Sequence, residues 1–288
     1  MSQASDHQPD TTIAYQGVPG AYSHLACQSR FPDMHAMANP SFENMLSRVT
    51  DGQAKYAMVP VENSVAGRVA DIHHLLPSSG LYIVGEHFQR VNHHLLGVKG
   101  SSISDLKEVH SHAQGLAQCR KGLAALNLTP IMHPDTAGAA ADIAAAGDKS
   151  VGAIASSLAG EIYDLEVLKA NFEDQEHNTT RMLIMAAEPE MPTLSNENVI
   201  TTLIFSLRST PAALYKALGG FATSGINLTK LESYIKGGTF SAAQFYIDAE
   251  CHQDSQAFAY ALEELKFFTQ EGSIQILGTY PADSARRR

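Results

Sequence analysis

Residues 178–182, which read Asn-Thr-Thr-Arg-Met, place a hydroxyl group beside a guanidinium group where a strand is expected to start, near Thr180. Threonine offers a mobile proton donor, and arginine offers a rigid fork of N–H groups that matches a carboxylate. The pair suits a small anionic substrate with an oxygen to be protonated. Because neighbouring strand residues point to opposite faces, both can serve one site only where the backbone is still turning. The alternative is an ordinary strand start, with Arg181 in a surface ion pair.

Three more polar clusters each follow an expected strand and precede an expected helix. This corner is where open α/β sheets bind ligands and where helix N–H groups meet anions. The alternative for each cluster is an ordinary connection or a helix cap. The clusters are Tyr22 and Ser23 after the strand 12–15, Glu62, Asn63 and Ser64 after the strand 56–60, and Ser111, His112 and Gln114 at the corner that ends the strand 109–111.

Residues 11–187 read as repeated strand–helix units, which predicts an α/β domain with a mostly parallel sheet. Ser41 is expected to cap a helix over 42–49, and Asp135 a helix over 137–146. If the domain has two lobes, the four polar clusters can converge on one cleft between them, a usual place for a small-molecule site.

A second module follows a short boundary. Residues 188–198 contain two prolines and several charges, which is typical of a linker. The remainder, 199–281, follows a βαββαβ order, the ferredoxin-like plan. Its first helix is expected to have Pro211 in its first turn, its hairpin to turn at 236–238, and its second helix to be capped by Asp254. Since it contains no nucleophile or metal motif, this module is expected to bind or regulate.

Composition narrows the function classes. The chain has 288 residues, 44% of them hydrophobic, and a formal net charge of −10. This charge argues against nucleic acid or an anionic membrane surface as the main partner. The three cysteines are far apart and fit reduced thiols. No basic-then-apolar leader opens the chain, and no apolar run of about 18 residues occurs, so a cytoplasmic protein is expected.

The histidines do not predict a metal site. His73-His74 and His93-His94 are adjacent pairs, and adjacent side chains do not share a helix or strand face. Because no Cys/His set has ligand spacing, no metal is expected. His73 and His74 are expected on a helix surface, and the three arginines at 286–288 in a solvated tail.

Four motifs, in order along the chain, resemble those of one enzyme family. The chain looks like a prephenate dehydratase of the monofunctional bacterial kind with a C-terminal ACT regulatory domain, and the resemblance covers nearly all of it. The motifs are residues 14–23 (AYQGVPGAYS), residues 59–67 (VPVENSVAG), residues 111–119 (SHAQGLAQC), with Ala113 where the family has proline, and residues 180–182 (TRM), with Met182 where the family has phenylalanine.

The resemblance implies a bilobed catalytic domain like the periplasmic binding proteins over 11–187, a linker over 188–198 and an ACT domain over 199–281. It also implies conversion of prephenate to phenylpyruvate, water and CO2 in L-phenylalanine biosynthesis, without a cofactor or metal. In this reaction Thr180 would donate a hydrogen bond or proton to the leaving hydroxyl, and Arg181 would clamp a carboxylate. The implied substrate-binding residues are Tyr22, Ser23, Glu62, Asn63, Ser64, Ser111, His112, Gln114, Asn178 and Thr179.

In the ACT domain the resemblance implies feedback inhibition by L-phenylalanine and side-by-side pairing into a homodimer or homotetramer. The family's effector motifs Gly-Ala-Leu and Glu-Ser-Arg-Pro stand here as residues 212–214 (AAL) and 232–235 (ESYI), and residues 225–228 (GINL) match its effector loop. Ala212 adds a methyl group where close backbone approach is expected. The implied L-phenylalanine-binding residues are Ala212, Ala213, Leu214, Asn227, Leu228, Glu232 and Ser233.

Two other functions stay open at this point. Arogenate dehydratase differs only in the amino group that replaces the substrate's keto group, and the motif residues do not separate the two substrates. A non-catalytic small-molecule sensor is the alternative from another class, because a bilobed binding fold joined to an ACT domain can bind and signal without catalysis. The adjacent Thr180 and Arg181 favour an enzyme.

Overall fold

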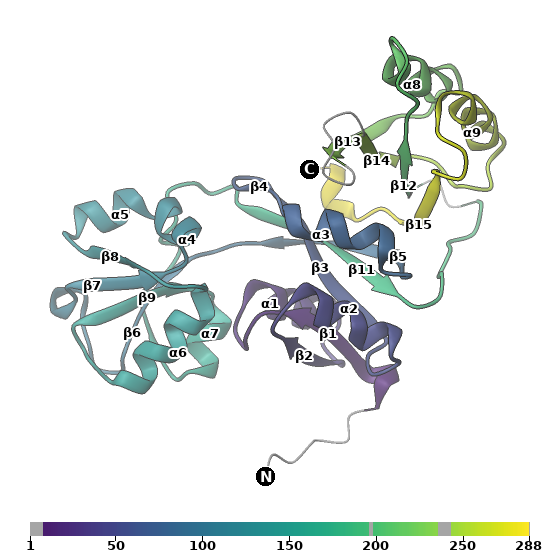
Figure 1. Ribbon diagram of the computed structural model, residues 1–288. Coiled ribbons are helices and arrows are strands. Elements are labelled where there is room, and N and C mark those ends of the chain that lie inside the picture. The colour runs from purple at the N-terminus through teal and green to yellow at the C-terminus, as the bar shows by residue number, and fades with distance from the viewer. Residues whose placement is uncertain (1–7, 196–197, 236–242, 288) are drawn as a thin grey trace. The chain divides into compact units, whose positions relative to one another are not determined.

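The computed structural model describes residues 8–195, 198–235 and 243–287, and its ribbon is shown in Figure 1. The chain divides into two compact units. The first holds Met1–Ile72 and His87–Met182, and the second holds His73–Glu86 and Leu183–Arg288. The domain limits expected from the sequence stay predictions, and this division differs from them in assigning His73–Glu86 to the second unit.

The first unit has two lobes, each built on a sheet with helices packed against it. The described elements of the first lobe are η1 (Pro9–Thr11), β1 (Thr12–Gln16), α1 (Tyr22–Arg30), β2 (His35–Asn39), α2 (Phe42–Thr50), β3 (Tyr56–Asn63) and β4 (Gly67–Arg68). The elements α3 (Ala70–Leu75), β5 (Tyr82–Arg90) and β11 (Thr179–Ala186) belong to it in part, and η2 (Leu76–Ser78) belongs to the second unit. The strand order is β2-β1-β3-β11-β5, with β4 paired to β3. β1 pairs in parallel with both β2 and β3, and its Ile13 is fully buried. As expected, the Ser41 side chain caps α2 by accepting from the N–H of Asn44.

The second lobe has helices on both faces of a mixed sheet, α4 and α5 on one and α6 and α7 on the other (Figure 1). Its described elements are β6 (His94–Gly97), η3 (Ile103–Asp105), β7 (Glu108–Ser111), α4 (Ala113–Gln118), α5 (Arg120–Ala125), β8 (Thr129–Met132), α6 (Thr136–Ala146), β9 (Val151–Ala155), α7 (Ser157–Ile162) and β10 (Glu166–Lys169), and the order is β10-β6-β9-β7-β8. Strand alternation explains the two faces. Leu95 and Ile154 pack with the α4 and α5 side, whereas Leu96 and Ala153 pack with the α6 and α7 side.

Two crossover segments, 91–93 and 170–178, connect the lobes and bind each other. The N–H of Phe172 donates to the carbonyl of His93 at 2.7 Å, and the amide of Asn92 donates to that of Asn171 at 2.9 Å. The N–H of His93 also donates to the carboxylate of Glu173 at 2.8 Å. A two-lobed α/β unit with paired crossovers confirms the expected binding-protein-like fold.

The second unit contains the expected βαββαβ module. Its elements are β12 (Val199–Ser206), α8 (Ala213–Thr223), β13 (Leu228–Ile235), β14 (Ala243–Ala249), α9 (Gln256–Phe268), β15 (Gln275–Pro281) and η4 (Ser284–Arg287). The strand order β13-β14-β12-β15 is joined by antiparallel pairs. α8 and α9 lie side by side on one face (Figure 1), where Phe205, Phe221 and Phe258 form the core.

Several local expectations need correction. Pro211 lies before α8 rather than in its first turn, because Ala212 is the N-cap and has a left-handed backbone (φ 60°). Ser255, not Asp254, caps α9. The helix expected after the strand 109–111 is two short helices, α4 and α5, and the strands β2 and β10 were not expected. The turn expected at 236–238 lies outside the described residues.

Two side chains expected in solvent are buried in the second unit. His73 is 2% exposed and packs edge-on against the ring of Tyr246 at 5.5 Å, because α3 lies against strands that are distant in sequence. The side chain of Arg286 is 14% exposed and pairs with Glu86 and Asp248. His74 is exposed as expected. In the described part of the chain, no helix combines the length and apolar character needed to cross a bilayer.

Candidate active site

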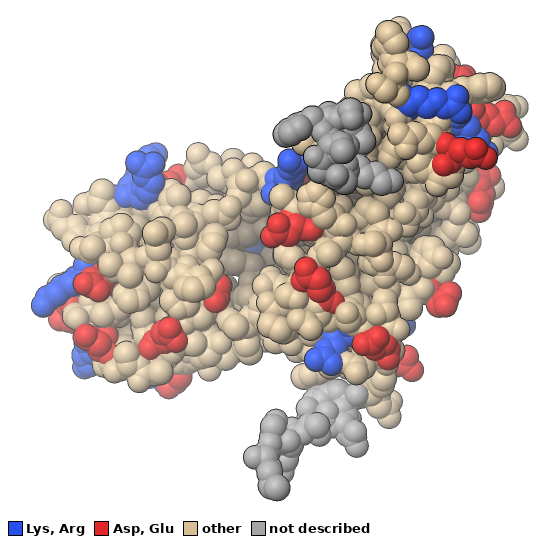
Figure 2. Space-filling model, in the orientation of Figure 1, with Lys and Arg blue, Asp and Glu red and all other residues tan. Residues whose placement is uncertain are grey.

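A cleft of about 360 Å³ lies within the first unit and draws its lining from both lobes and both crossovers. Figure 2 shows the surface hollowed where these two lobes meet. The lining residues are Gln16, Tyr22, Ser23, Pro60, Asn63, Val69, Val91, His93, His112, Gln114, Gly115, Gln118, Pro134, Asp135, Thr136, Asn178, Thr180 and Met182.

The cleft gathers residues from all four polar clusters expected from the sequence, although they are up to 158 positions apart (Tyr22 to Thr180). The expected residues in its lining are Tyr22, Ser23, Asn63, His112, Gln114, Asn178 and Thr180. The expected residues outside its lining are Glu62, Ser64, Ser111, Thr179 and Arg181. Gln118 and His93 line the cleft and were not expected.

Strand alternation separates Thr180 from Arg181. β11 has already begun at Thr179, so the backbone is extended there and neighbouring side chains face opposite ways. Thr180 and Met182 face the cleft. Arg181 is 3% exposed, and its Nη1 donates to the carboxylate of Glu62 at 3.0 Å. The role of Arg181 as a substrate clamp stays a prediction, and the geometry gives Glu62 the role of partner to this guanidinium.

Ser64, Thr179 and Ser111 hold the backbone around the cleft. The hydroxyl of Ser64 donates to the carbonyl of His177 at 2.7 Å and accepts from the N–H of Thr179 at 3.0 Å. These bonds fix the start of β11 beside β3. Ser111 is fully buried, and its hydroxyl donates to the carbonyl of Ile154 at 2.6 Å, which ties β7 to β9.

The cleft offers neutral donors to an anion. Among its described lining residues none is lysine or arginine, and Asp135 is the single carboxylate. Asp135 caps α6 by accepting from the N–H of Gly138. α1 begins at the cleft with Tyr22 and Ser23, and its N-cap Ala21 supplies no side-chain hydrogen bond. The N–H groups of this first turn and the helix dipole therefore form a site for a carboxylate.

A glycine holds α1 at the cleft. Gly20 has a φ of +88°, and a Cβ there would approach the backbone of Ala159 within 2.8 Å. Its carbonyl accepts from the hydroxyl of Ser156 at 2.6 Å. This contact between the lobes needs both the left-handed backbone and the missing side chain.

A chain of hydrogen bonds runs along the floor of the cleft. Asn63 Nδ2 donates to Thr180 Oγ1 at 2.9 Å and to Asn178 Oδ1 at 2.7 Å. Asn178 Nδ2 donates to Gln118 Oε1, which also lies 2.8 Å from His93 Nε2. The chain continues to the Tyr22 hydroxyl, 2.8 Å from His93 Nδ1, and ends at the carbonyl of Asn92, which accepts from this hydroxyl at 2.9 Å.

Burial sets the protonation of two members of this chain. It raises the pKa of Tyr22 well above its ordinary value, so the phenol stays protonated. It lowers the pKa of His93, against the opposing effects of the hydrogen bond to Gln118 and of Glu173, so the imidazole is neutral at pH 7. At pH 7 both side chains are therefore neutral, and they can act through the position of their hydrogen bonds.

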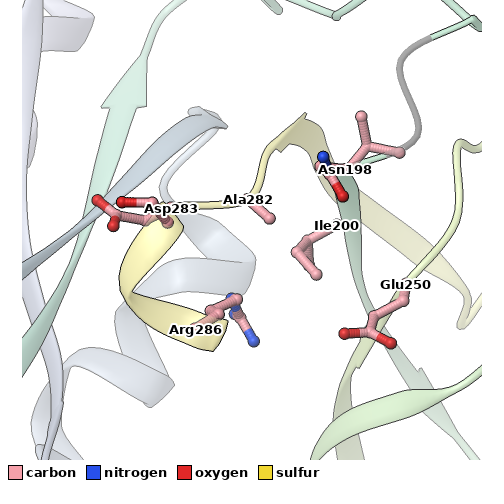
Figure 3. A pocket seen from close by; sticks show the side chains of 8 residues that line it. Asn198, Ile200, Glu250, Ala282, Asp283 and Arg286 are labelled. Carbon is pink, nitrogen blue, oxygen red and sulfur yellow. The ribbon is translucent and has the colours of Figure 1, made fainter. Parts of the chain in front are cut away.

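A second cavity, of about 410 Å³, lies in the second unit between the start of β12 and the segment that follows β15 (Figure 3). Asn198, Ile200, Glu250, Asp283 and Arg286 line it. None of the expected L-phenylalanine-binding residues is in this lining. Of these, Ala212, Ala213 and Leu214 lie at the start of α8, Asn227 and Leu228 at the start of β13, and Glu232 and Ser233 within β13.

The fold and the cleft define a two-lobed α/β enzyme with a donor-rich site for a small anion. Comparison with known proteins gives the same class: the family model for prephenate dehydratase matches residues 13–190. The chain belongs to the prephenate dehydratase family.

Three relatives illustrate the range of this similarity. The chain is 48% identical over 276 residues to a bifunctional N-acyl-homoserine lactone acylase/prephenate dehydratase of Komagataeibacter europaeus, covering 96% of this chain and 98% of that protein. It is 38% identical to the chloroplastic arogenate dehydratase/prephenate dehydratase 1 of Arabidopsis thaliana, covering 95% and 73%. The crystal structure of the Arthrobacter aurescens prephenate dehydratase in complex with L-Phe matches with a TM-score of 0.86 and 27% identity, covering 96% and 91%.

Proposed function

We propose that this protein converts prephenate to phenylpyruvate, water and CO2 in L-phenylalanine biosynthesis. The observation that carries the proposal is the bond from Asn63 Nδ2 to Thr180 Oγ1, at 2.9 Å. Because the Thr180 oxygen accepts this bond, its own proton is available to another acceptor in the cleft. The hydroxyl is thus presented as a donor to a substrate oxygen.

The chemistry of prephenate fits such a donor. Loss of CO2 from the ring carboxylate and of the ring hydroxyl leaves an aromatic ring, so the reaction has a large thermodynamic drive. The enzyme has to hold two carboxylates and assist departure of the hydroxyl. Thr180 is a weak acid and acts by its position next to that hydroxyl. The first turn of α1 is positioned to receive one carboxylate.

Under this proposal the βαββαβ module is an ACT domain that binds L-phenylalanine and inhibits the enzyme. The complex of the Arthrobacter aurescens relative with L-Phe supports this. Binding at a seam between two such modules would make the protein at least a homodimer, working in the cytoplasm. Ala212, Asn227 and Glu232 are the residues proposed to contact the effector or its loop.

Arogenate dehydration is the alternative at the same site. The Arabidopsis thaliana relative that is 38% identical carries both names, and the two substrates share the ring, the leaving hydroxyl and the ring carboxylate. The same Thr180 and α1 contacts serve either substrate. The site residues therefore do not distinguish the two reactions, and the turnover rates with prephenate and with arogenate have to be compared.

A second candidate function is hydrolysis of the amide bond of N-acyl-homoserine lactones. One relative of 48% identity carries this activity in its name. An apolar cavity of about 530 Å³ in the second lobe offers room for an acyl chain. Its lining residues are Ala113, Leu116, Ala117, Arg120, Leu123, Ala124, Leu128, Pro130 and Met132. Incubation with a long-chain substrate tests this, since hydrolysis must release the free fatty acid and homoserine lactone together.

The deciding experiment follows phenylpyruvate formed from prephenate at neutral pH, read by its absorbance in strong base, with and without L-phenylalanine. Neutral pH is needed because acid converts prephenate without an enzyme. Turnover that L-phenylalanine suppresses supports both the catalytic and the regulatory proposals. No turnover with prephenate, followed by none with arogenate, would favour the non-catalytic sensor.

A further inference from the structure

We propose that His93 is a positioning residue that turns the amide of Gln118, so that the NH2 group of this amide faces the substrate. The proposal rests on the proposed function for its kinetic consequence, and its structural part stands on the hydrogen bonds alone. His93 lies in the first crossover, and Gln118 is the last residue of α4. Both line the cleft.

Backbone groups at one end of the hydrogen-bond chain fix its order of donors and acceptors. Asn63 Oδ1 accepts from the N–H groups of Val65 and Ala66, at 2.9 and 2.8 Å. A backbone N–H can only donate, so this atom of Asn63 must be the oxygen and the other must be the NH2 group. The NH2 group then donates to Thr180 Oγ1 and to Asn178, whose contacting atom must be its oxygen.

The donor and acceptor atoms of Asn178, Gln118 and His93 follow in the same way. Since Asn178 accepts through Oδ1, its Nδ2 donates, and the atom of Gln118 that receives this bond must be Oε1. His93 Nε2 lies 2.8 Å from the same oxygen, so it must carry a proton. In the neutral ring Nδ1 is then bare, and the single proton of the Tyr22 hydroxyl is shared between this nitrogen, at 2.8 Å, and the carbonyl of Asn92, at 2.9 Å. This assigns the tautomer of His93.

The consequence lies at Gln118. Its oxygen is occupied by two donors, Asn178 and His93, and its NH2 group makes no hydrogen bond to the described part of the protein. The cleft has no lysine or arginine among its described lining residues, so each neutral N–H donor matters to an anionic substrate. If the amide were reversed, a carbonyl oxygen would face a carboxylate, and the NH2 group would face two other donors. His93 makes this reversal unfavourable.

The values of KM and kcat distinguish a positioning role of His93 from a packing role. Under this proposal Gln118 binds the substrate equally before and during the reaction, so losing its orientation should raise KM and leave kcat nearly unchanged. His93→Asn keeps a polar group near Nδ1 but cannot reach Gln118. His93→Gln places an NH2 group near the position of Nε2. We expect His93→Asn to raise KM for prephenate about ten- to a hundredfold, with kcat within about threefold, and His93→Gln to restore most of the loss.

His94→Asn is the matched control, because its side chain lies next to His93 in sequence on the other face of the segment and outside the cleft lining. It should leave KM unchanged. An unchanged KM in His93→Asn, or equal losses in His93→Asn and His93→Gln, would overturn the proposal and leave His93 a packing residue. These outcomes presuppose turnover by the wild-type protein, whose absence would reject the proposed function instead.

Ring-nitrogen NMR of 15N-labelled wild-type protein tests the structural part without any activity. The His93 signals are assigned by their loss in His93→Asn. We expect a protonated Nε2 and a bare Nδ1, and Tyr22→Phe should increase the Nδ1-protonated form. A wild-type ring protonated at Nδ1 alone would overturn the inference even in an active enzyme.

Discussion

Arg286 holds Glu86 through two parallel bonds, from its Nε to Oε1 and from its Nη2 to Oε2, the second at 2.9 Å. Nη2 also donates to Asp248 at 3.1 Å, and Nη1 to the hydroxyl of Thr229 at 3.0 Å. The side chains of Glu86 and Asp248 are both 0% exposed. One guanidinium, two residues before Arg288, thus joins three separate segments of the second unit.

Removing this guanidinium should destabilise the second unit strongly. Arg286→Ala removes a guanidinium that two buried carboxylates share, and breaking a buried pair in this way costs about 3–5 kcal/mol. Urea unfolding measures the loss in the free energy of unfolding. Arg90→Ala, at an exposed arginine, should change it by less than about 0.5 kcal/mol. Equal losses for the two substitutions would show that the buried ion pair adds no more to the free energy of unfolding than an exposed arginine does.

The Thr180 hydroxyl should govern the chemical step. Thr180→Ala removes the donor to the leaving oxygen and should lower kcat about 100- to 1,000-fold, the loss typical of one placed transition-state donor. Thr180→Ser keeps the hydroxyl and should retain much more activity. Steady-state turnover of prephenate at neutral pH gives both values, with circular dichroism to check folding. A folded Thr180→Ala variant with most of its turnover would remove this residue from the mechanism.

Gly278 should tolerate no side chain, because a Cβ there would lie 2.0 Å from the backbone oxygen of Ile83. Gly278→Ala must push two backbones apart, and we expect a loss of about 2–4 kcal/mol in the free energy of unfolding. Gly219→Ala is the matched control, since nothing lies within 4 Å of its Cβ position in α8. That change should be neutral or stabilise by about 0.5–1 kcal/mol. Urea unfolding of both variants measures the difference.

Ala212 occupies a left-handed backbone position, with φ 60°, at the N-cap of α8. A methyl group there costs about 1–2 kcal/mol of strain, which Ala212→Gly removes. Glycine also increases the conformational entropy of the unfolded chain, which destabilises the folded protein by a smaller amount. We expect the variant to be as stable as the wild type or slightly more so, and to bind L-phenylalanine more tightly. Calorimetric titration with L-phenylalanine measures the affinity. Weaker binding by the variant would argue that the alanine methyl contacts the effector.

Stability should fall as the solution becomes acidic below about pH 6.5. Burial lowers the pKa of His24, His93 and His94 in the folded protein, whereas in the unfolded chain each has its ordinary value of about 6.5. Between the folded and unfolded pKa values the unfolded state binds more protons, so stability rises with pH across that window and is complete above 6.5. Urea unfolding from pH 5 to pH 7.5 measures the slope, which His93→Gln should reduce. An unchanged slope would contradict the assigned burial effect.

Local signals made part of this fold predictable. Ser41 and Asp135 have side chains that cap helices directly, and both do so. The strand β2, by contrast, reads His-Ala-Met-Ala-Asn and has no β-branched residue, so its sequence lacks a strand signal. Its parallel pairing with β1 decides the conformation. His73 and Arg286 were misjudged for the same reason, since their burial depends on partners far along the chain.

The sequence predicted which residues form the site better than it predicted how their side chains are arranged. The motifs pointed to Asn63, Asn178 and Thr180, and the cleft gathers them. They did not separate Thr180 from Arg181, although strand alternation gave the reason in advance. His93 was missed because its role depends on Tyr22 and Gln118, each on a different element. Only the folded structure supplies those distances.

The hydrogen-bond chain beneath the cleft has a consequence for how such a sequence can evolve. The N–H groups of Val65 and Ala66 fix which atom of Asn63 accepts, and each side chain then fixes which atom of the next one donates or accepts. Replacing one amide by a carboxylate, as in Asn178→Asp, would set oxygen against oxygen at Gln118 and leave its neighbours misdirected. Substitutions here should therefore be strongly non-additive. Homologues should exchange these residues together or keep them all, whereas the apolar lining can drift one position at a time.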